Sequence, residues 1–439
     1  MAVTHRSLSI AVESSFGSLD PTTGLPPVTV SEISGSGLTF TSIPCERDPI
    51  VIAGEPVVSE RNDARDGSYF IPSEPDTVYS SGSRVRRRTG QIVCRVDLTT
   101  IGTAADNYTS NYLGLLLGAG LKTKLPSVIT DTVTGVSGNE YTPGSAPAVA
   151  DIGTLISTSI SGIAEYSAIT DNDGGTGNVI CSPAFSANSY TALRGLQTWY
   201  TPSRTETGNF ESSVAFIIEG VNFKTLAFGC VLESLNITLD NGRLMAEFTY
   251  QAAFITDDHA NAAGPTEPSY NTGAAPLFRG SYVVLSSASP SSLTNASSPD
   301  ALGRIALDCE DFSLTYTNTL TPLGHSNSIL AMSGMEISDV AVELSLTIST
   351  VNTTIKDDFF NRTVRQVLVG TGPQGDGQGC AIMLPAAMLT NDPNVYDISG
   401  NDIVRQQLTY QQSRYSGDFS TSAYEANAGN SPFRIALGV

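Results

Sequence analysis

The sequence predicts a mainly β fold, because long stretches alternate apolar and polar residues with a period of two. The clearest lies between Leu232 and Ile255, where two alternating runs flank the turn-forming segment Asp240-Asn241-Gly242-Arg243. Another run, from Val340 to Ile348, places five apolar residues on one face. Charged residues make up only 15% of the chain, which suits strands and turns more than surface helices.

Two predicted helices each follow an alternating strand. The strand Ile92–Leu98 precedes a leucine-rich helix over 110–125, which Ser110 can cap and Pro126 ends. The strand Val340–Ile348 precedes a helix over 353–368, capped by Thr353 or Thr354 and ended by Gly370. The runs "CVLESLNITL" and "CEDFSLTYT" also each place an alternating strand shortly after a cysteine. This repeated order favours two tandem antiparallel β-sandwich or partial-barrel domains, each with one flanking α-helix.

The expected domain boundaries follow composition. Residues 1–258 form the first β domain, and the Ala-, Gly- and Pro-rich stretch near 257–275 is the junction before a second domain over 276–439. Residues 1–83 have little periodicity and many turn formers, so we expect an extended N-terminal arm. Residues 126–212 are rich in Ser, Thr, Gly and Asn and are expected to be a loop insertion with a few strands.

Charge and cysteine usage narrow the class of protein. The formal net charge is −20 over 439 residues, which disfavours binding to nucleic acid or to anionic membranes. No apolar run approaches the roughly 20 residues that span a bilayer, and no signal peptide is expected. Six scattered cysteines form no C-x-x-C pair and are expected to be reduced, as in a protein made in a cytoplasm.

No motif carries the spacing that catalysis or metal binding needs. The three histidines lie far apart, and "DNDGG" at 171–175 lacks the spacing of a calcium loop. "GTGPQGDGQG" at 370–379 follows a predicted helix instead of opening one. We therefore expect no enzyme, no cofactor and no catalytic, cofactor-binding or metal-ligating residues.

Polar side chains on the predicted strands are candidates for a lumen or for contacts between subunits. They comprise Asp240, Asn241, Arg243, Glu247 and Glu343. The dense basic run Arg84, Arg86, Arg87 and Arg88 is a further candidate. It is a solvated strand face, a clamp for an acidic patch on a neighbouring copy, or a nucleic-acid contact.

Four stretches carry a resemblance to a known family. They are "AVESSFGSLDP", "ERNDARDGSYF" followed by "YLGLLLGAGL", "FGCVLESLNITLDNGRLMAEFTYQAA", and "FSLTYTNTL" followed by "ISDVAVELSLTIS" and "IMLPAAML". In this order they resemble the tail tube proteins of long-tailed bacteriophages, in particular the larger tube subunits. The segment from Pro126 to Ser212 departs from that pattern.

The resemblance implies a structural virion protein that stacks in rings to form the channel for DNA ejection. Ribbons from successive subunits would close into a barrel without exposed edges. A duplicated subunit implies a trimeric ring rather than a hexamer, with residues 40–83 as the tie between rings. Expected partners are other copies and the tail terminator, tape measure and tail-tip proteins, with DNA passing without specific binding. The expected location is the virion tail, assembled in the host cytoplasm.

Two other classes stay open on the sequence alone. One is a secreted or surface β-sandwich adhesin or glycan-active protein, which would favour a signal sequence, disulfides or an aromatic cleft. The other is a different virion protein, such as a decoration or tail-tip protein.

Overall fold

The computed structural model describes most of the chain. The described residues are 6–18, 37–46, 49–53, 58–63, 67–72, 89–98, 111–128, 130–145, 151–172, 178–187, 189–201, 210–256, 282–287, 303–324, 332–349, 353–371, 379–393, 396–399, 403–413, 429 and 431–438. The prediction of a mainly β fold is confirmed, because antiparallel strands dominate this part of the chain.

The first group of paired strands comes from residues before 257. β1 pairs with β2 and β15, β15 with β16, β16 with β17, and β17 with β6. The free side of β6 pairs with β3 and, through a single bridge, with Cys45 just after β2, so the pairings return to β2. The bounds are β1 Ser7–Val12, β2 Thr41–Ile43, β3 Ile50–Ala53, β6 Gly90–Asp97, β15 Val214–Gly220, β16 Phe223–Asp240 and β17 Arg243–Ile255.

The second group, after residue 281, repeats this order of pairing. β18 pairs with β19 and β22, β22 with β23, β23 with β25, β25 with β21, and β21 with β20, which follows β19. β24 adds to β25. The bounds are β18 Tyr282–Ser287, β19 Ile305–Ala306, β20 Cys309–Gly324, β21 Met332–Ile348, β22 Val364–Thr371, β23 Cys380–Leu389, β24 Tyr396–Ser399 and β25 Ile403–Gln412.

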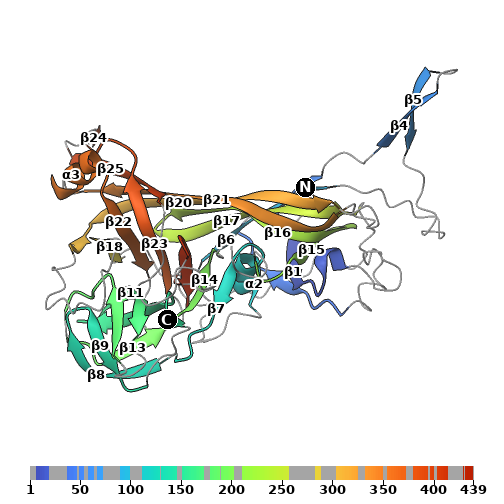
Figure 1. Ribbon diagram of the computed structural model, residues 1–439. Coiled ribbons are helices and arrows are strands. Elements are labelled where there is room, and N and C mark those ends of the chain that lie inside the picture. The colour runs from blue at the N-terminus through green and yellow to red at the C-terminus, as the bar shows by residue number, and fades with distance from the viewer. Residues whose placement is uncertain are drawn as a thin grey trace.

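One edge of β16 joins the two groups. Residues 223–230 of this edge pair with β15, whereas residues 234–238 pair with β20 of the second group. At the changeover, the backbone N–H of Leu232 donates to the carbonyl of Ala119, and the Leu232 carbonyl accepts from Asn318 Nδ2. The long strands β16, β17, β20 and β21 therefore run side by side as one sheet (Figure 1).

The hairpin predicted between Leu232 and Ile255 is confirmed as β16 and β17. Asn241 and Gly242 have φ of 50° and 79°, as a two-residue type I′ turn requires, and Asp240 lies opposite Arg243. Asparagine and glycine tolerate the left-handed region better than other residues, which explains why this pair ends the alternating run.

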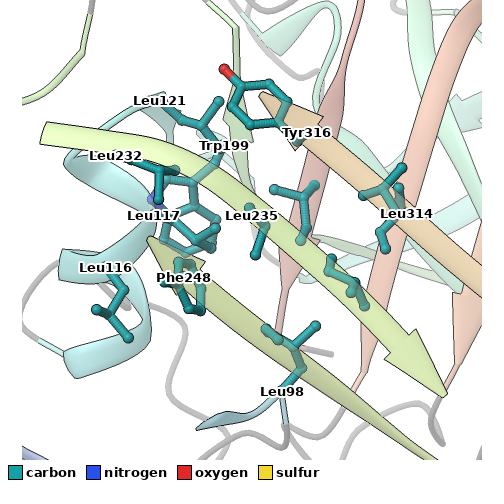
Figure 2. Close-up of a cluster of buried hydrophobic side chains, with 14 of the residues drawn as sticks. Leu98, Leu116, Leu117, Leu121, Trp199, Leu232, Leu235, Phe248, Leu314 and Tyr316 are labelled. Carbon is teal, nitrogen blue, oxygen red and sulfur yellow. The ribbon is translucent and has the colours of Figure 1, made fainter. Parts of the chain in front are cut away.

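One face of this sheet packs into the main hydrophobic core. Leu235, Ile237, Phe248 and Leu314 are 0–1% exposed, and Leu344 on β21 is 0% exposed, as the alternation predicts. Figure 2 shows Leu117 of α2 (Tyr112–Gly118) and Trp199 close to Leu235 and Phe248. The core therefore lies against this face of the sheet, where α2 covers the part that belongs to the first group, and it continues under the second group.

Both helices occur, but their lengths differ from the prediction. α2 ends at Gly118 and its N-cap is Asn111, whose side chain accepts from the Leu113 N–H. α3 covers only Thr353–Asn361, so the predicted extension to 368 is wrong. The segment that follows forms β22, which is held between β18 and β23. Its apolar run suits a strand buried on both faces.

The expectation of a mostly loop insertion over 126–212 is also wrong. A closed barrel occupies most of it, and β14 (Gln197–Tyr200) follows, paired with β7 (Lys122–Lys124) and with β26 (Arg434–Leu437). The barrel packs on the outer face of β18, β22 and β23, where Tyr166 Oη donates to the Thr371 carbonyl over 2.8 Å. Its strands are β8 Thr130–Ser137, β9 Glu140–Pro143, β10 Leu155–Ile160, β11 Ile163–Asn172, β12 Val179–Ser182 and β13 Ala192–Gly195.

The expected N-terminal arm is in part a component of the main sheet, because β2 and β3 pair with β1 and β6. β4 (Val58–Asp63) and β5 (Gly67–Pro72) form a hairpin that, among the described strands, pairs only with itself. Figure 1 shows this hairpin apart from the sheet.

A buried carboxylate explains the first motif, "AVESSFG". Glu13 is 4% exposed and accepts from the N–H groups of Gly17 and Gly229 and from the hydroxyls of Ser18 and Ser213. Gly229 has a φ of 61° and belongs to the "FGC" segment of β16. The N-terminal turn η1 (Phe16–Ser18) is thereby fixed to β16, more than 200 residues away in the sequence.

All six cysteines are free, and four of them are buried. Burial raises the pKa of the Cys181, Cys309 and Cys380 thiols to about 12. These thiols are protonated at neutral pH and therefore poor nucleophiles.

The face assignment of β21 makes a stability prediction. Leu344→Asp should lower the free energy of unfolding by about 3–5 kcal/mol, because it buries an unpaired charge. Glu343→Gln, one residue earlier on the exposed face, should change it by less than about 0.5 kcal/mol. Chemical denaturation of both variants measures this, and equal losses would contradict the assignment.

The second prediction concerns Glu13. Burial, the largest effect, raises the pKa of its carboxyl above 4.5, so the folded state holds the proton more tightly than the unfolded state. The stability contributed by the protonated form is therefore lost as pH rises through the folded pKa. The unfolding free energies of wild type and Glu13→Gln should be measured from below pH 4.5 to neutral pH. As pH rises, wild type should lose stability relative to Glu13→Gln, which has no carboxyl at this position. A difference that does not change with pH would contradict it.

Candidate functional site

The main sheet has a second, polar face opposite the core. Across six neighbouring strands, Arg95, Glu247, Asn236, Thr315, Glu343 and Gln411 lie opposite one another in one row. All six are exposed or half-buried. The row holds two acids and one arginine, and the neighbouring positions on this face are mostly Ser and Thr, as at Ser313, Thr317 and Thr409. A broad surface of this kind is hydrated and weakly acidic.

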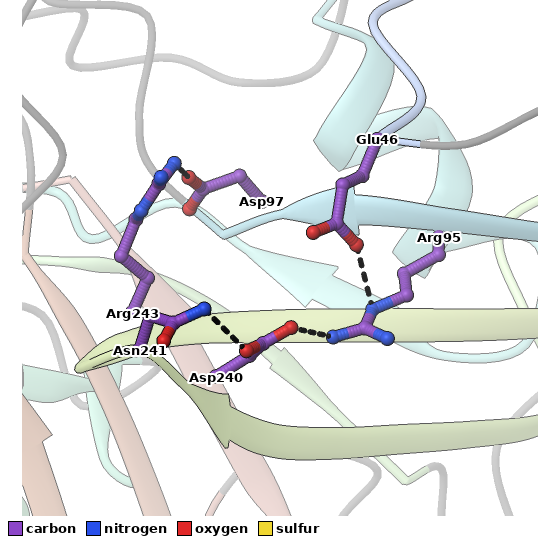
Figure 3. A network of polar contacts seen from close by, with 6 residues as sticks. All are labelled: Glu46, Arg95, Asp97, Asp240, Asn241 and Arg243. Carbon is purple, nitrogen blue, oxygen red and sulfur yellow. Dashed lines mark hydrogen bonds and ion pairs between the residues drawn. The ribbon is translucent and has the colours of Figure 1, made fainter.

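The tip of the β16–β17 hairpin is tied to β6 by a polar network (Figure 3). Arg95 lies at its centre, with Nη2 2.6 Å from Asp240 Oδ2 and Nε 2.9 Å from Glu46 Oε2. Asn241 Nδ2 donates to Asp240 Oδ1 over 2.9 Å, and Arg243 Nη1 lies 3.4 Å from Asp97. The network holds the turn and the segment after β2 against β6.

The structure places the five predicted site residues that it describes at the hairpin tip and in the polar row. Asp240, Asn241 and Arg243 lie at the hairpin tip, while Glu247 and Glu343 lie in the polar row. Glu343 accepts from Gln411 Nε2 over 2.9 Å. The basic run Arg84, Arg86, Arg87 and Arg88 lies outside the described residues.

Sequence reasoning did not single out Arg95, Glu46 or Gln411. Arg95 sits on the polar side of a recognised alternating strand, so its face could be predicted. Its partners Glu46 and Asp240 lie 49 and 145 residues away in the sequence, and no local pattern indicates those contacts.

A hollow of about 430 Å³ lies on the polar face where the ladder between β21 and β25 ends, at Glu343 and Gln411. Thr315, Glu343, Gln411 and Gln412 contribute to its lining, and Gln412 Nε2 donates to the Val340 carbonyl. Glu343 is the one titratable group in that lining. In the part of the chain that the structure describes, no three His, Cys, Asp or Glu side chains are grouped to hold a metal ion.

Two strands at opposite ends of the main sheet have an edge that no described strand covers. β3 pairs only with β6, and β24 pairs only with β25. On β3, Ile50 and Ile52 are 47% and 53% exposed. Unpaired edges with exposed apolar residues invite pairing with another strand.

Within the described residues, neither helix is long and apolar enough to cross a membrane.

The described features define a mainly β protein that presents a wide polar sheet face and open strand edges. The chain matches the family model described as phage tail tube protein over residues 5–411, and it belongs to that family. A search of curated proteins found no match.

The Arg95 network makes a prediction with a matched control. Arg95→Gln should lower the free energy of unfolding by about 1 kcal/mol, because it removes two ion pairs and leaves Glu46 and Asp240 uncompensated. Arg243→Gln should cost less than about 0.5 kcal/mol, since that side chain is 52% exposed and has one long contact. Urea unfolding at low and high salt measures both. The gap between the two variants should narrow as salt screens the charges, and a gap independent of salt would contradict this account.

Proposed function

We propose that this chain is the major tube subunit of a bacteriophage tail, and that its stacked rings form the channel through which DNA is ejected. Membership of the tail tube family carries the proposal. The wide polar face and the open edges at β3 and β24 support it, because closure of a sheet between copies satisfies such edges. The role is structural and not catalytic.

In this proposal, residues 1–258 and 276–439 are two tube domains. The repeated order of strand pairing supports the division. Three chains then supply the six similar domains of a ring, with a trimer favoured over a hexamer.

The polar face lines the channel in this arrangement. Glu247 and Glu343 lie on it, and the chain carries a formal charge of −20. Carboxylates repel the phosphates of double-stranded DNA, whereas an array of free Lys or Arg would bind them and slow passage. Arg95 is held by Asp240 and Glu46, so its charge is already balanced by neighbours. DNA thus passes without specific binding.

The partners follow from the same role. The tube would contact other copies of itself along its length, the tape measure protein inside it, and the tail terminator and tail-tip proteins at its ends. Assembly would take place in the cytoplasm of the bacterial host, and the finished protein would reside in the virion tail.

Electron microscopy of the purified protein tests the proposal. Long hollow tubes or stacked rings are expected, and native mass spectrometry of a detached ring should give three chains. Six chains would contradict the trimer while leaving the tube intact. Dispersed monomers at every concentration and ionic strength would contradict the tube itself.

A further prediction concerns the β4–β5 hairpin, which we propose as the tie between rings. Replacing residues 58–72 by a short Gly/Ser linker should give a soluble, folded subunit with an unchanged main unfolding transition, because among the described strands this hairpin pairs only with itself. The same variant should form rings that do not stack. Normal tubes from it, seen by electron microscopy, would remove the hairpin from the stacking contact.

A further inference from the structure

The joint between the two strand groups has a defined register. On β16, Ile237 lies opposite Leu314 of β20, and Thr238 lies opposite Ser313. The distal half of β16 thus meets a strand that pairs, on its other side, with β21. This joint lies within one chain, and its register can be compared with that of a joint between two copies of the chain.

Strand registers align the two groups residue by residue. The segments Phe248-Thr249-Tyr250-Gln251 and Leu408-Thr409-Tyr410-Gln411 share three identical residues. Tyr250 lies opposite Leu232 and Ile92, and Tyr410 lies opposite Leu389 and Leu344. Both tyrosines are buried and adjoin a helix: Tyr250 donates to the Leu116 carbonyl of α2, and Asp358 of α3 raises the pKa of Tyr410 in addition to the larger effect of burial. Tyr250 and Tyr410 therefore occupy equivalent positions.

A second pair of residues fits the same alignment. Val96 and Ile348 each come four residues after the strand partners of the two tyrosines, Ile92 and Leu344. Cys45 lies opposite Val96, and Cys309 lies opposite Ile348. Each cysteine is followed by a glutamate in the sequence. The equivalent of Cys309 is therefore Cys45 and not Cys230, which the sequence patterns had paired with it.

The alignment assigns a counterpart to each strand of the internal joint. Val51 of β3 lies opposite Ile92 as Leu314 of β20 lies opposite Leu344, so β3 corresponds to β20. Ala246 and Gln406 each come four residues before the equivalent tyrosines, Tyr250 and Tyr410. Ile237 of β16 lies opposite Ala246, and Tyr396 of β24 lies opposite Gln406. β24 therefore corresponds to the distal half of β16.

The counterparts differ from the internal joint in one respect. β16 and β20 pair with each other, whereas β24 and β3 each leave an edge open among the described strands. Phe360, in the last turn of α3, is 68% exposed, and Figure 1 shows α3 next to β24 and β25. Its counterpart region in α2 is buried beside the joint, where Ala119 accepts from Leu232.

We infer that β24 of one copy pairs antiparallel with β3 of a second copy, in the register of the internal joint. Val51 then lies opposite Tyr396 of the partner subunit, and Ile50 lies opposite Asp397 of the partner subunit. This pairing covers the open edge that carries Ile50 and Ile52. The inference rests on the proposed function only in requiring that copies associate in rings.

Paired cysteines test the register. Ile50→Cys with Asp397→Cys places thiols at directly opposite positions, where Cβ atoms in antiparallel strands lie about 4.5–5.5 Å apart. Mild oxidation of the assembled protein should then give a ladder of covalent multimers on a denaturing gel. Ile50→Cys with Ser399→Cys is the shifted control, with a separation of about 7–8 Å or more that disulfides do not span. Thr238→Cys with Ser313→Cys reports the same geometry within one chain and should give an oxidised monomer.

The outcomes separate this inference from the proposed function. Tubes in which the 50/397 pair stays monomeric, or in which the 50/399 pair cross-links equally well, overturn the register and leave the tube standing. A protein that never assembles overturns both. Hydrogen–deuterium exchange tests the same pairing in the protein without any substitution. Amides of 50–53 and 396–399 should gain protection in tubes relative to free subunits, and unchanged exchange at either strand overturns the pairing.

Discussion

The fold depends on how one strand, β16, passes from one pairing partner to another along the same edge. An unpaired backbone N–H or carbonyl in a core costs as much as a lost hydrogen bond, so a strand that leaves one partner for another must satisfy the groups between them. β16 does so at Leu232, whose N–H reaches the C-terminal end of α2 and whose carbonyl receives Asn318. The extra residue Glu233 forms a bulge there, between Leu232 and Ser234. With these contacts in place, both strand groups share one sheet and one core.

Much of this arrangement is readable from the sequence, and the reason is the period of two. In β17 and β21 one face meets the core and the other meets water, so whether a residue is apolar or polar predicts the face on which it lies. The Asn241-Gly242 turn is equally local. The polar row was foreseeable to the extent that Glu247 and Glu343 lie on the water-facing side of recognised strands.

The features that were missed are those without a one-sided pattern. The barrel strand β10 is buried at five of its six positions, so it shows no alternation. β22 is likewise buried on both faces over most of its length, and its valines and leucines fitted a helix equally well. The contact of Glu13 with Gly229 and the equivalence of Cys45 with Cys309 exist only through strand pairing across long separations. Such information appears once the registers are known.

The barrel β8–β13 enters and leaves the sheet through adjacent strands, because β7 and β14 pair with each other. A module whose two ends are neighbours can change in size without stretching the scaffold that carries it. The barrel cannot simply be deleted, since Leu155 and Tyr166 cover Val284, Leu368 and Met383. Its far turn at Ser161 and Gly162 is exposed, as is Ile163 beside it. An insertion at that turn would meet solvent and would leave the core of the barrel and its contacts with the sheet intact.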